Sequence, residues 1–196
     1  ADLLVSLKIP YLGFPYKLEY HSEDLSPADG KKIIMNLPTT TQGVLITYLN
    51  KARDAIELAD YLGIQLVQFH GDIHIQELAL LKEKRPRLAI IKSLIIGKQP
   101  LSTIFSVIDA YSPVVDVFIT DTFDPNTGAS GATGKTHDWE VSQRIVEYSH
   151  LPVILAGGLN AGNVREAIKK VKPAGVDVHT GGEGGNGRKD FDKVQA

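Results

Sequence analysis

The sequence contains no cysteine and only one methionine and one tryptophan among its 196 residues. The lack of cysteine excludes disulfides, thiolate zinc sites and cysteine catalysis by these residues. No apolar run is long enough to cross a bilayer and no signal-peptide pattern opens the sequence, so we expect a cytoplasmic protein. A net charge of −2 and a pI near 6.3 provide no basic footprint for nucleic acid or an anionic membrane.

Histidine, the other common metal ligand, occurs six times. His70 and His74 have a spacing that could hold a metal, but no third ligand is spaced to join them. We therefore interpret them as polar residues at the rim of a loop, and the sequence predicts neither a metal nor a cofactor.

Short apolar runs alternate with amphipathic helical patterns along the whole chain. This alternation predicts a parallel α/β sheet whose two faces are both covered. About seven runs are expected to be strands, namely Ala1–Leu7, Gly43–Leu49, Leu66–Phe69, Leu88–Lys92, Val114–Ile119, Val153–Ala156 and Gly175–Thr180. No linker or short repeat divides residues 1–196, so we expect a single domain. Because a closed (β/α)8 TIM barrel has about eight strands, the count predicts such a barrel with one βα unit absent from the sequence.

Two glycine pairs follow consecutive expected strands near the end of the chain. Gly157-Gly158 follows Val153–Ala156, with Asn160 placed to cap the next helix, and Gly181-Gly182 follows Gly175–Thr180. Glycine allows backbone N–H groups to approach an anion, and a helix N-terminus carries partial positive charge. One such pair alone is more typical of a tight turn. Two at neighbouring strand ends predict a phosphate site, as found after the last two strands of this barrel class.

Polar residues at the C-terminal ends of strands are the usual catalytic candidates in this fold. They are Gln68, His70, Lys92, Asp121, Asp177 and His179. Strand alternation predicts that Asp177 and His179 share one face and point into the barrel mouth, with Val176 and Val178 on the other face. Gln68 and His70 form a similar pair, and we expect Gln68, His70 and Asp177 to contact a substrate.

Asp121 is the strongest candidate for a general acid, because burial at a strand end raises a carboxyl pKa. The alternative is a residue that only caps or hydrogen-bonds its loop. The glycine-rich stretch Thr122–Thr136 is long for a βα loop, which predicts either a lid over the mouth or a disordered insertion.

Several motifs together resemble one enzyme family. They are QFHGD at 68–72, ITDT at 119–122, GATGKTHDW at 131–139, LAGGLNAGNV at 155–164, GVDVHTGGE at 175–183 and KD at 189–190. Their order and spacing are similar to those of phosphoribosylanthranilate isomerases, from about Ala1 to the end. LSP at 25–27 resembles the start of that family's second helix.

The resemblance implies a (β/α)8 barrel that converts N-(5′-phosphoribosyl)anthranilate to 1-(2-carboxyphenylamino)-1-deoxyribulose phosphate in tryptophan biosynthesis. In this Amadori rearrangement an acid opens the ribose ring and a base removes the C2′ proton. The family's acid falls on Asp121. The backbone donors that hold the phosphate fall on Gly157, Gly158, Thr180, Gly181 and Gly182.

The sequence departs from the family in four places. The family's base is a cysteine in a KICG motif on the first strand, and neither the motif nor any cysteine is present. The resemblance aligns Ala1–Leu7 with the second strand, so the first βα unit is the one not found. Glu23-Asp24 stands where the family has an arginine for the anthranilate carboxylate, and His179-Thr180 replaces two serines.

Three alternatives stay open. The sequence lacks termini that the protein has, or the enzyme uses a different base, for which His179 is a candidate because histidine can exchange a proton near neutral pH. The third alternative is a barrel that serves as a phosphate-binding or regulatory module without catalysis. A seven-stranded sheet also has two open edges, and we expect these to favour a homodimer or low stability.

Overall fold

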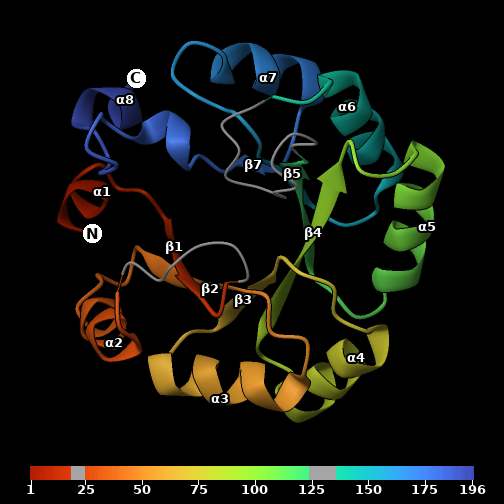
Figure 1. Cartoon of the computed structure of the whole chain (residues 1–196), viewed down its shortest axis with the longest axis horizontal. Helices are drawn as coiled ribbons and strands as arrows, with labels where there is room; N and C mark the ends of the chain where they lie inside the picture. The colour runs from red at the N-terminus through yellow and green to blue at the C-terminus, as the bar shows by residue number, and fades with distance from the viewer. Residues whose placement is uncertain (19–24, 124–135) are drawn as a thin grey trace. The chain divides into compact units, whose positions relative to one another are not determined.

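The computed structural model describes residues 1–18, 25–123 and 136–196. Two compact units, residues 1–92 and residues 93–196, divide the chain, and each is described by itself. Strands alternate with helices in both units, and in each unit the helices lie outside the strands (Figure 1). The predicted α/β class is therefore confirmed.

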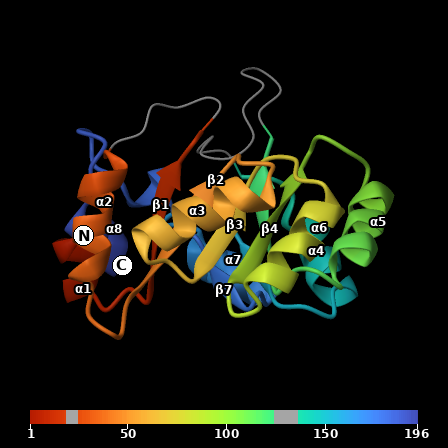
Figure 2. The same cartoon turned by 90° about the horizontal axis from the view of Figure 1, so that it is seen from below.

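The first unit contains four parallel strands, of which the last, β4, continues into the second unit. Its elements are α1 (Asp2–Ser6), β1 (Tyr11–Tyr16), α2 (Pro27–Met35), β2 (Gln42–Thr47), α3 (Ala52–Leu62), β3 (Leu66–Phe69), α4 (Ile75–Lys84) and β4 (Ala89–Ile96). The strands pair in chain order, with Val44 opposite Leu66 and Leu66 opposite Ala89. Helices α3 and α4 cover strands β2 to β4 (Figure 2).

The second unit continues the same alternation. After the end of β4 it contains α5 (Leu101–Tyr111), β5 (Val117–Thr122), α6 (Trp139–Tyr148), β6 (Val153–Leu155), α7 (Val164–Val171), β7 (Gly175–Val176), the 3₁₀ turn η1 (Thr180–Gly182) and α8 (Phe191–Gln195). β5 pairs in parallel with β6 and β6 with β7, so that Ile154 lies opposite Ile119 on one side and Gly175 on the other. This order brings the ends of β5, β6 and β7 together at one edge.

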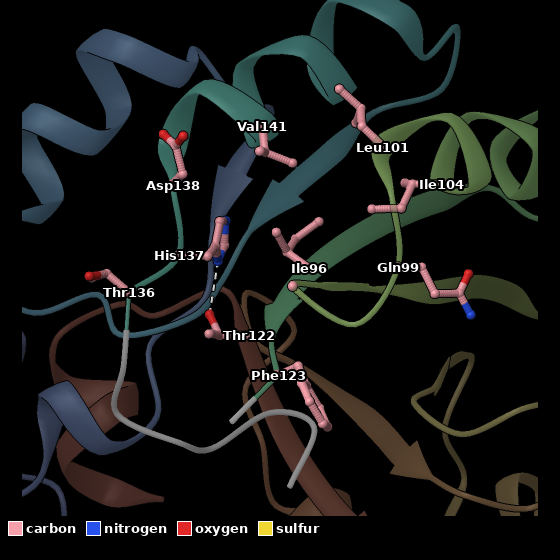
Figure 3. A pocket seen from close by; sticks show the side chains of 11 residues that line it. Ile96, Gln99, Leu101, Ile104, Thr122, Phe123, Thr136, His137, Asp138 and Val141 are labelled. Atoms are coloured by element: carbon pink, nitrogen blue, oxygen red, sulfur yellow. Dashed lines mark hydrogen bonds between the residues drawn. The ribbon is translucent and has the colours of Figure 1, made fainter. Parts of the chain in front are cut away.

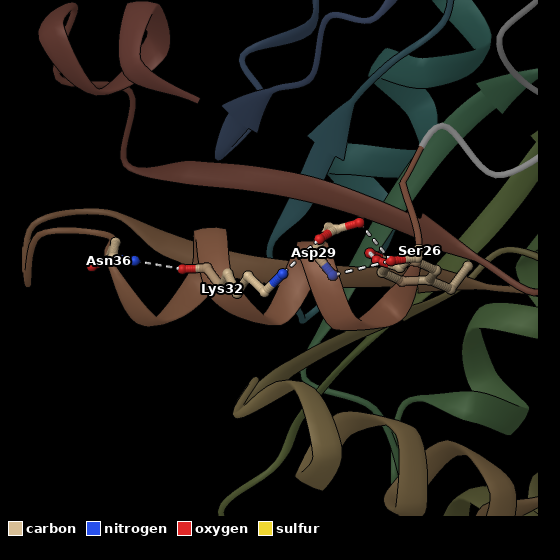
Figure 4. Close-up of polar contacts among 5 residues, drawn as sticks. Ser26, Asp29, Lys32 and Asn36 are labelled. Atoms are coloured by element: carbon tan, nitrogen blue, oxygen red, sulfur yellow. Dashed lines mark hydrogen bonds and ion pairs between the residues drawn. The ribbon is translucent and has the colours of Figure 1, made fainter.

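Helix boundaries mostly follow the local chemistry of the sequence. Ser26 caps α2 as predicted: its Oγ accepts the Asp29 N–H at 3.2 Å, and Pro27 occupies the first helical position (Figure 4). Helix α3 ends at Gly63, which has φ of +76° and forms the left-handed C-cap that glycine favours.

The strand predicted at Ala1–Leu7 is wrong. Residues Asp2–Ser6 form helix α1, and the first strand forms further along the chain, as β1. In β1 the side chains of Leu12, Phe14 and Tyr16 are buried, while the alternate positions are exposed or half-buried. The proline and glycine of this strand fit an edge position, where β2 is its one strand neighbour within the first unit. Tertiary pairing therefore overrode the turn chemistry that those residues suggest.

Candidate active site

The first glycine junction adopts the backbone geometry that requires glycine. Gly157 and Gly158 follow β6 with φ angles of +100° and +65°. Such positive φ values place L side chains in contact with the adjacent backbone, so other residues are strained there. The chain can then turn sharply from β6 towards α7.

The loop after this junction is held by asparagine side chains, although not as predicted. The N-cap of α7 is Asn163, and the prediction of Asn160 is wrong. Asn160 accepts the Gly162 N–H at 2.9 Å through its own Oδ1, which forms a local turn before the helix. Asn163 Oδ1 accepts the Asn160 N–H at 2.8 Å, and its Nδ2 donates to the Gly158 carbonyl at 3.0 Å.

The second junction differs more from the prediction. Strand β7 ends at Val176, and η1 begins at Thr180, so the strand does not extend through Asp177 and His179. The predicted alternation of faces is therefore wrong, and Val176 and Val178 are 39% and 37% exposed. β7 pairs with only two residues of β6, and after the Asp177 N–H, which donates to the Leu155 carbonyl at 2.9 Å, the chain leaves extended geometry.

The two junctions meet closely. A Cβ on Gly181 would lie 1.8 Å from the Leu159 carbonyl oxygen, so only glycine fits against the loop that follows β6. Among the residues that the structure describes, the backbone N–H groups of Gly157, Gly158, Thr180 and Gly181 form no hydrogen bond. The Gly182 N–H, in contrast, donates to the His179 carbonyl at 3.2 Å. Four unused donors on two touching loops can hold an anion.

Asp121 lies near the end of β5 and is half-buried. Burial raises the pKa of its carboxyl to about 7, the negative charge of Asp177 adds to this rise, and a hydrogen bond from the Thr122 N–H at 2.8 Å partly opposes it. A carboxyl with this pKa is substantially protonated near neutral pH, as a general acid requires.

Asp177 and His179 follow β7 in the same unit. Surrounding protein atoms raise the pKa of the Asp177 carboxyl, while the charges of His179 and Lys189 oppose this rise. The Asp177 side chain is itself exposed. The His179 ring is 58% exposed, and its Nε2 lies 3.7 Å from Glu183 Oε1, which also accepts from Lys189 Nζ at 2.9 Å.

One contact joins the acid strand to the first glycine loop, and sequence reasoning missed it. A Cβ on Gly157 would lie 2.2 Å from Thr122 Oγ1 and 3.1 Å from His137 Nδ1. His137 belongs to the GATGKTHDW motif, but that motif carried no signal of which atoms its ring contacts. Asp121, through its neighbour Thr122, is thereby placed beside the Gly157 loop.

Of the site residues predicted in the first unit, Gln68 and His70 lie at and just after the end of β3, whereas Lys92 lies within β4 and not at its end as predicted. Gln68 and His70 are each 8% exposed, and the His70 ring packs on Tyr48 with centroids 5.1 Å apart. Lys92, at 6% exposure, donates to the Gly71 carbonyl at 3.0 Å, and burial lowers its pKa to about 8. His74 caps α4, where its Nδ1 accepts the Gln76 N–H at 3.4 Å.

Two predictions fall largely on residues outside the described ranges. Glu23-Asp24 lies there, and so does most of the Thr122–Thr136 loop. Within residues 1–18, 25–123 and 136–196, no group of three or more acidic or histidine side chains could hold a metal ion. No helix in those ranges is both long enough and apolar enough to cross a membrane.

The described features define a class of protein: a parallel α/β fold with a carboxyl of raised pKa and two touching glycine loops at its strand ends. The family described as N-(5′-phosphoribosyl)anthranilate (PRA) isomerase matches residues 15–196. N-(5′-phosphoribosyl)anthranilate isomerase 2 of Methanosarcina mazei is 40% identical over 168 residues, which are 84% of this chain and 71% of that protein. The chain therefore belongs to the phosphoribosylanthranilate isomerase family.

Solved structures agree with this assignment. Monomers generated from the dimeric isomerase of Thermotoga maritima superpose with a TM-score of 0.79 and 25% identity, over 99% of this chain and 88% of that one. An isomerase in complex with reduced 1-(o-carboxyphenylamino)-1-deoxyribulose 5-phosphate has the same TM-score, with 24% identity and the same coverage. The barrel fold predicted from the sequence is confirmed by this likeness.

Proposed function

We propose that this chain catalyses the Amadori rearrangement of N-(5′-phosphoribosyl)anthranilate in tryptophan biosynthesis. The observation that carries the proposal is the junction of β5, β6 and β7, where a carboxyl of raised pKa adjoins two touching glycine loops. Family membership supports the same reaction.

Asp121 is the proposed general acid. It gives its proton to the ribose ring oxygen while the bond from that oxygen to C1′ breaks and the anthranilate nitrogen lone pair forms the Schiff base. A base then removes the C2′ proton, and the electrons of that bond form the enolamine, which tautomerises to the ketone. The reaction is an isomerisation, so it needs no oxidant or reductant. The half-buried environment that raises the pKa of Asp121 supports this role.

The proposed phosphate site consists of the backbone of Gly157, Gly158, Thr180, Gly181 and Gly182. Four of these residues have N–H groups without a protein partner among the described residues, whereas the Gly182 N–H already has one. We therefore assign Gly182 a steric role, since its turn lets Thr180 and Gly181 approach the first loop. A phosphorylated substrate also agrees with the compound bound in one similar isomerase.

His179 is the proposed base, because an imidazole can accept a proton near neutral pH and His179 immediately precedes η1, the turn of the second proposed phosphate loop. Its exposed ring near Asp177 and Glu183 leaves the nitrogen accessible to a ligand. Substrate contacts by Gln68, His70 and Asp177 stay predictions, as do a homodimer and a cytoplasmic location.

A second candidate function is a phosphate-binding module without catalysis, because the four unused backbone donors can hold an anion without the help of a base. An assay of purified protein with N-(5′-phosphoribosyl)anthranilate, combined with inorganic phosphate titration, separates the two. Turnover supports the isomerase, and loss of C2′ proton transfer in His179→Ala, with phosphate affinity kept, supports His179 as the base. Phosphate binding without turnover indicates the binding module, and unchanged turnover in His179→Ala removes His179 from the mechanism.

A further inference from the structure

His137 lies between two buried hydroxyl groups just before α6. Its Nδ1 is 2.8 Å from Thr122 Oγ1, and its Nε2 is 2.5 Å from Ser142 Oγ (Figure 3 shows the first contact). Thr122 is 5% exposed and Ser142 is fully buried. The imidazole thus links the last residue of β5 to the first turns of α6.

The ring is neutral under ordinary conditions. Burial lowers the pKa of His137 to about 4, although the adjacent Asp138 charge opposes this change. Asp138 is itself engaged at the helix N-terminus, where its Oδ1 accepts the Glu140 N–H at 2.9 Å. A neutral imidazole has one donor and one acceptor nitrogen, so one hydroxyl donates to the ring and the other accepts from it. Both ring nitrogens are therefore engaged, which fixes the ring orientation.

Thr122 transmits this restraint to the proposed acid. The Thr122 N–H donates to Asp121 Oδ1, so the position of Thr122 sets the orientation of the carboxyl. The Thr122 hydroxyl also packs against Gly157, at the site where a Cβ would come within 2.2 Å of Oγ1. A Cβ built on Gly157 would also lie 3.1 Å from His137 Nδ1, so the ring lies beside this glycine. One side chain therefore contacts both the strand that carries the acid and the loop that faces the phosphate.

A neighbouring pocket of about 440 Å³ shows that one side of His137 is not packed by described residues. Its wall includes Ile96, Leu101, Ile104, Phe123 and Val141, together with Thr122 and His137 (Figure 3). Because apolar side chains form most of this wall, they cannot replace the hydrogen bonds of the ring. The two hydroxyls must hold it.

We propose that His137 is a positioning residue, which holds the Asp121 carboxyl in register with the Gly157-Gly158 loop through its Nδ1 contact with Thr122. This inference rests on the proposed function of Asp121 and the glycine loops. It assigns His137 no contact with substrate. The Nε2 contact with Ser142 fixes the ring, and the Nδ1 contact in turn fixes the Thr122 side chain.

A pair of amide substitutions separates the two contacts. The side-chain amide of His137→Asn reaches the position of Nδ1 and can still meet Thr122, whereas that of His137→Gln reaches the position of Nε2 and can still meet Ser142. We expect His137→Asn to keep kcat within about threefold of wild type. We expect His137→Gln to lower kcat by about tenfold or more and to change KM less, because a misplaced catalytic group mainly slows the chemical step. The exposed His150, changed to Asn and Gln, is the matched control.

A purely structural role predicts a different result. Equal losses in the Asn and Gln variants that follow their melting temperatures, or wild-type kinetics in both, would overturn the proposal. Two further measurements do not depend on turnover: inorganic phosphate affinity and the Asp121 carboxyl pKa from ¹³C NMR.

In His137→Gln we expect weaker phosphate binding and a higher Asp121 pKa, because loosening Thr122 weakens the N–H bond that lowers it. If the wild-type protein shows no turnover, the proposed function fails, and these two quantities still decide the role of His137. Unchanged values in His137→Gln would then overturn it.

Discussion

At the scale of single residues, the environment of Asp121 decides its chemistry. The same side chain on an open loop would be ionised at neutral pH. Here burial and the nearby Asp177 raise its pKa to about 7, and the Thr122 N–H prevents a further rise. Thr122, which fixes that N–H, is held in turn by His137. The acid therefore depends on neighbours that do not themselves react.

We expect Asp121→Asn to lower kcat/KM by about 10²–10⁴-fold, the usual contribution of a general acid. In the wild-type enzyme, kcat/KM should fall as pH rises through about 7, because the protonated carboxyl is the active form and it is lost above its pKa. Steady-state assays between about pH 5 and pH 9, a range that brackets this pKa, measure both effects. Asp192→Asn on α8 serves as an exposed control. A flat profile would rule out Asp121 as the acid.

At the scale of secondary structure elements, the strand order brings the two loops of the proposed phosphate site together. β6 pairs with β7 in parallel, with Ile154 opposite Gly175, so both glycine junctions emerge at the same edge. Asn163 then ties the first loop to the start of α7. In the second loop, Lys189 donates to the His179 carbonyl at 2.7 Å and to the Glu183 side chain. Each loop is held by its own side chains before any ligand binds. Such preorganised donors need little rearrangement to bind an anion.

Two alanine substitutions test the contact between the loops. In Gly181→Ala the new Cβ would meet the Leu159 carbonyl, which is backbone and cannot move away easily, whereas Gly185 has open space around it. Neither glycine has a positive φ, so the comparison isolates the steric effect. We expect Gly181→Ala to lose about 1–3 kcal/mol of stability and to bind phosphate at least about tenfold more weakly. Gly185→Ala should match wild type in calorimetry and denaturant unfolding. Equal behaviour of the two variants would contradict the loop contact.

At the scale of the whole molecule, the pKa shifts of several ionisable groups change stability in opposite directions with pH. Burial raises the pKa values of Asp121 and Asp177 and lowers those of His137 and Lys92. A carboxyl whose pKa is higher in the folded state binds more protons there, so stability falls as pH rises from about 4 to about 7. A histidine whose pKa falls to about 4 has the opposite effect below pH 6.5. The proposed acid is thus destabilising at the pH where it would work.

Asp121→Asn should therefore be more stable than wild type above pH 7, by about 2 kcal/mol, which allows for partial solvent access. Below about pH 4 the difference should vanish, since the wild-type carboxyl is then protonated in both states. Urea unfolding at several pH values measures this difference, and Asp192→Asn controls for a change of charge. A variant less stable than wild type at pH 8 would show that the carboxylate is well solvated or paired.

The order of strands and helices, the capping of α2 by Ser26 and the paired glycines all followed from local patterns, because each depends on neighbouring residues in the sequence. The motif resemblance likewise identified the family. The strand predictions were wrong at both ends of the chain. Ala1–Leu7 was predicted to be a strand but forms α1, and Gly175–Thr180 was predicted to be one strand but leaves extended geometry after Val176.

Tertiary structure decided these points because a strand exists only where a partner strand supplies hydrogen bonds, and that partner is remote in sequence. For the same reason the sequence did not predict the contacts of His137 with Thr122 and with Ser142, because these contacts depend on how α6 packs beside β5. The raised pKa of Asp121 also required the fold, since burial is a property of the packed chain. Residue types and their spacing thus identify the candidate acid and the candidate phosphate loops. Long-range packing determines how they are held together.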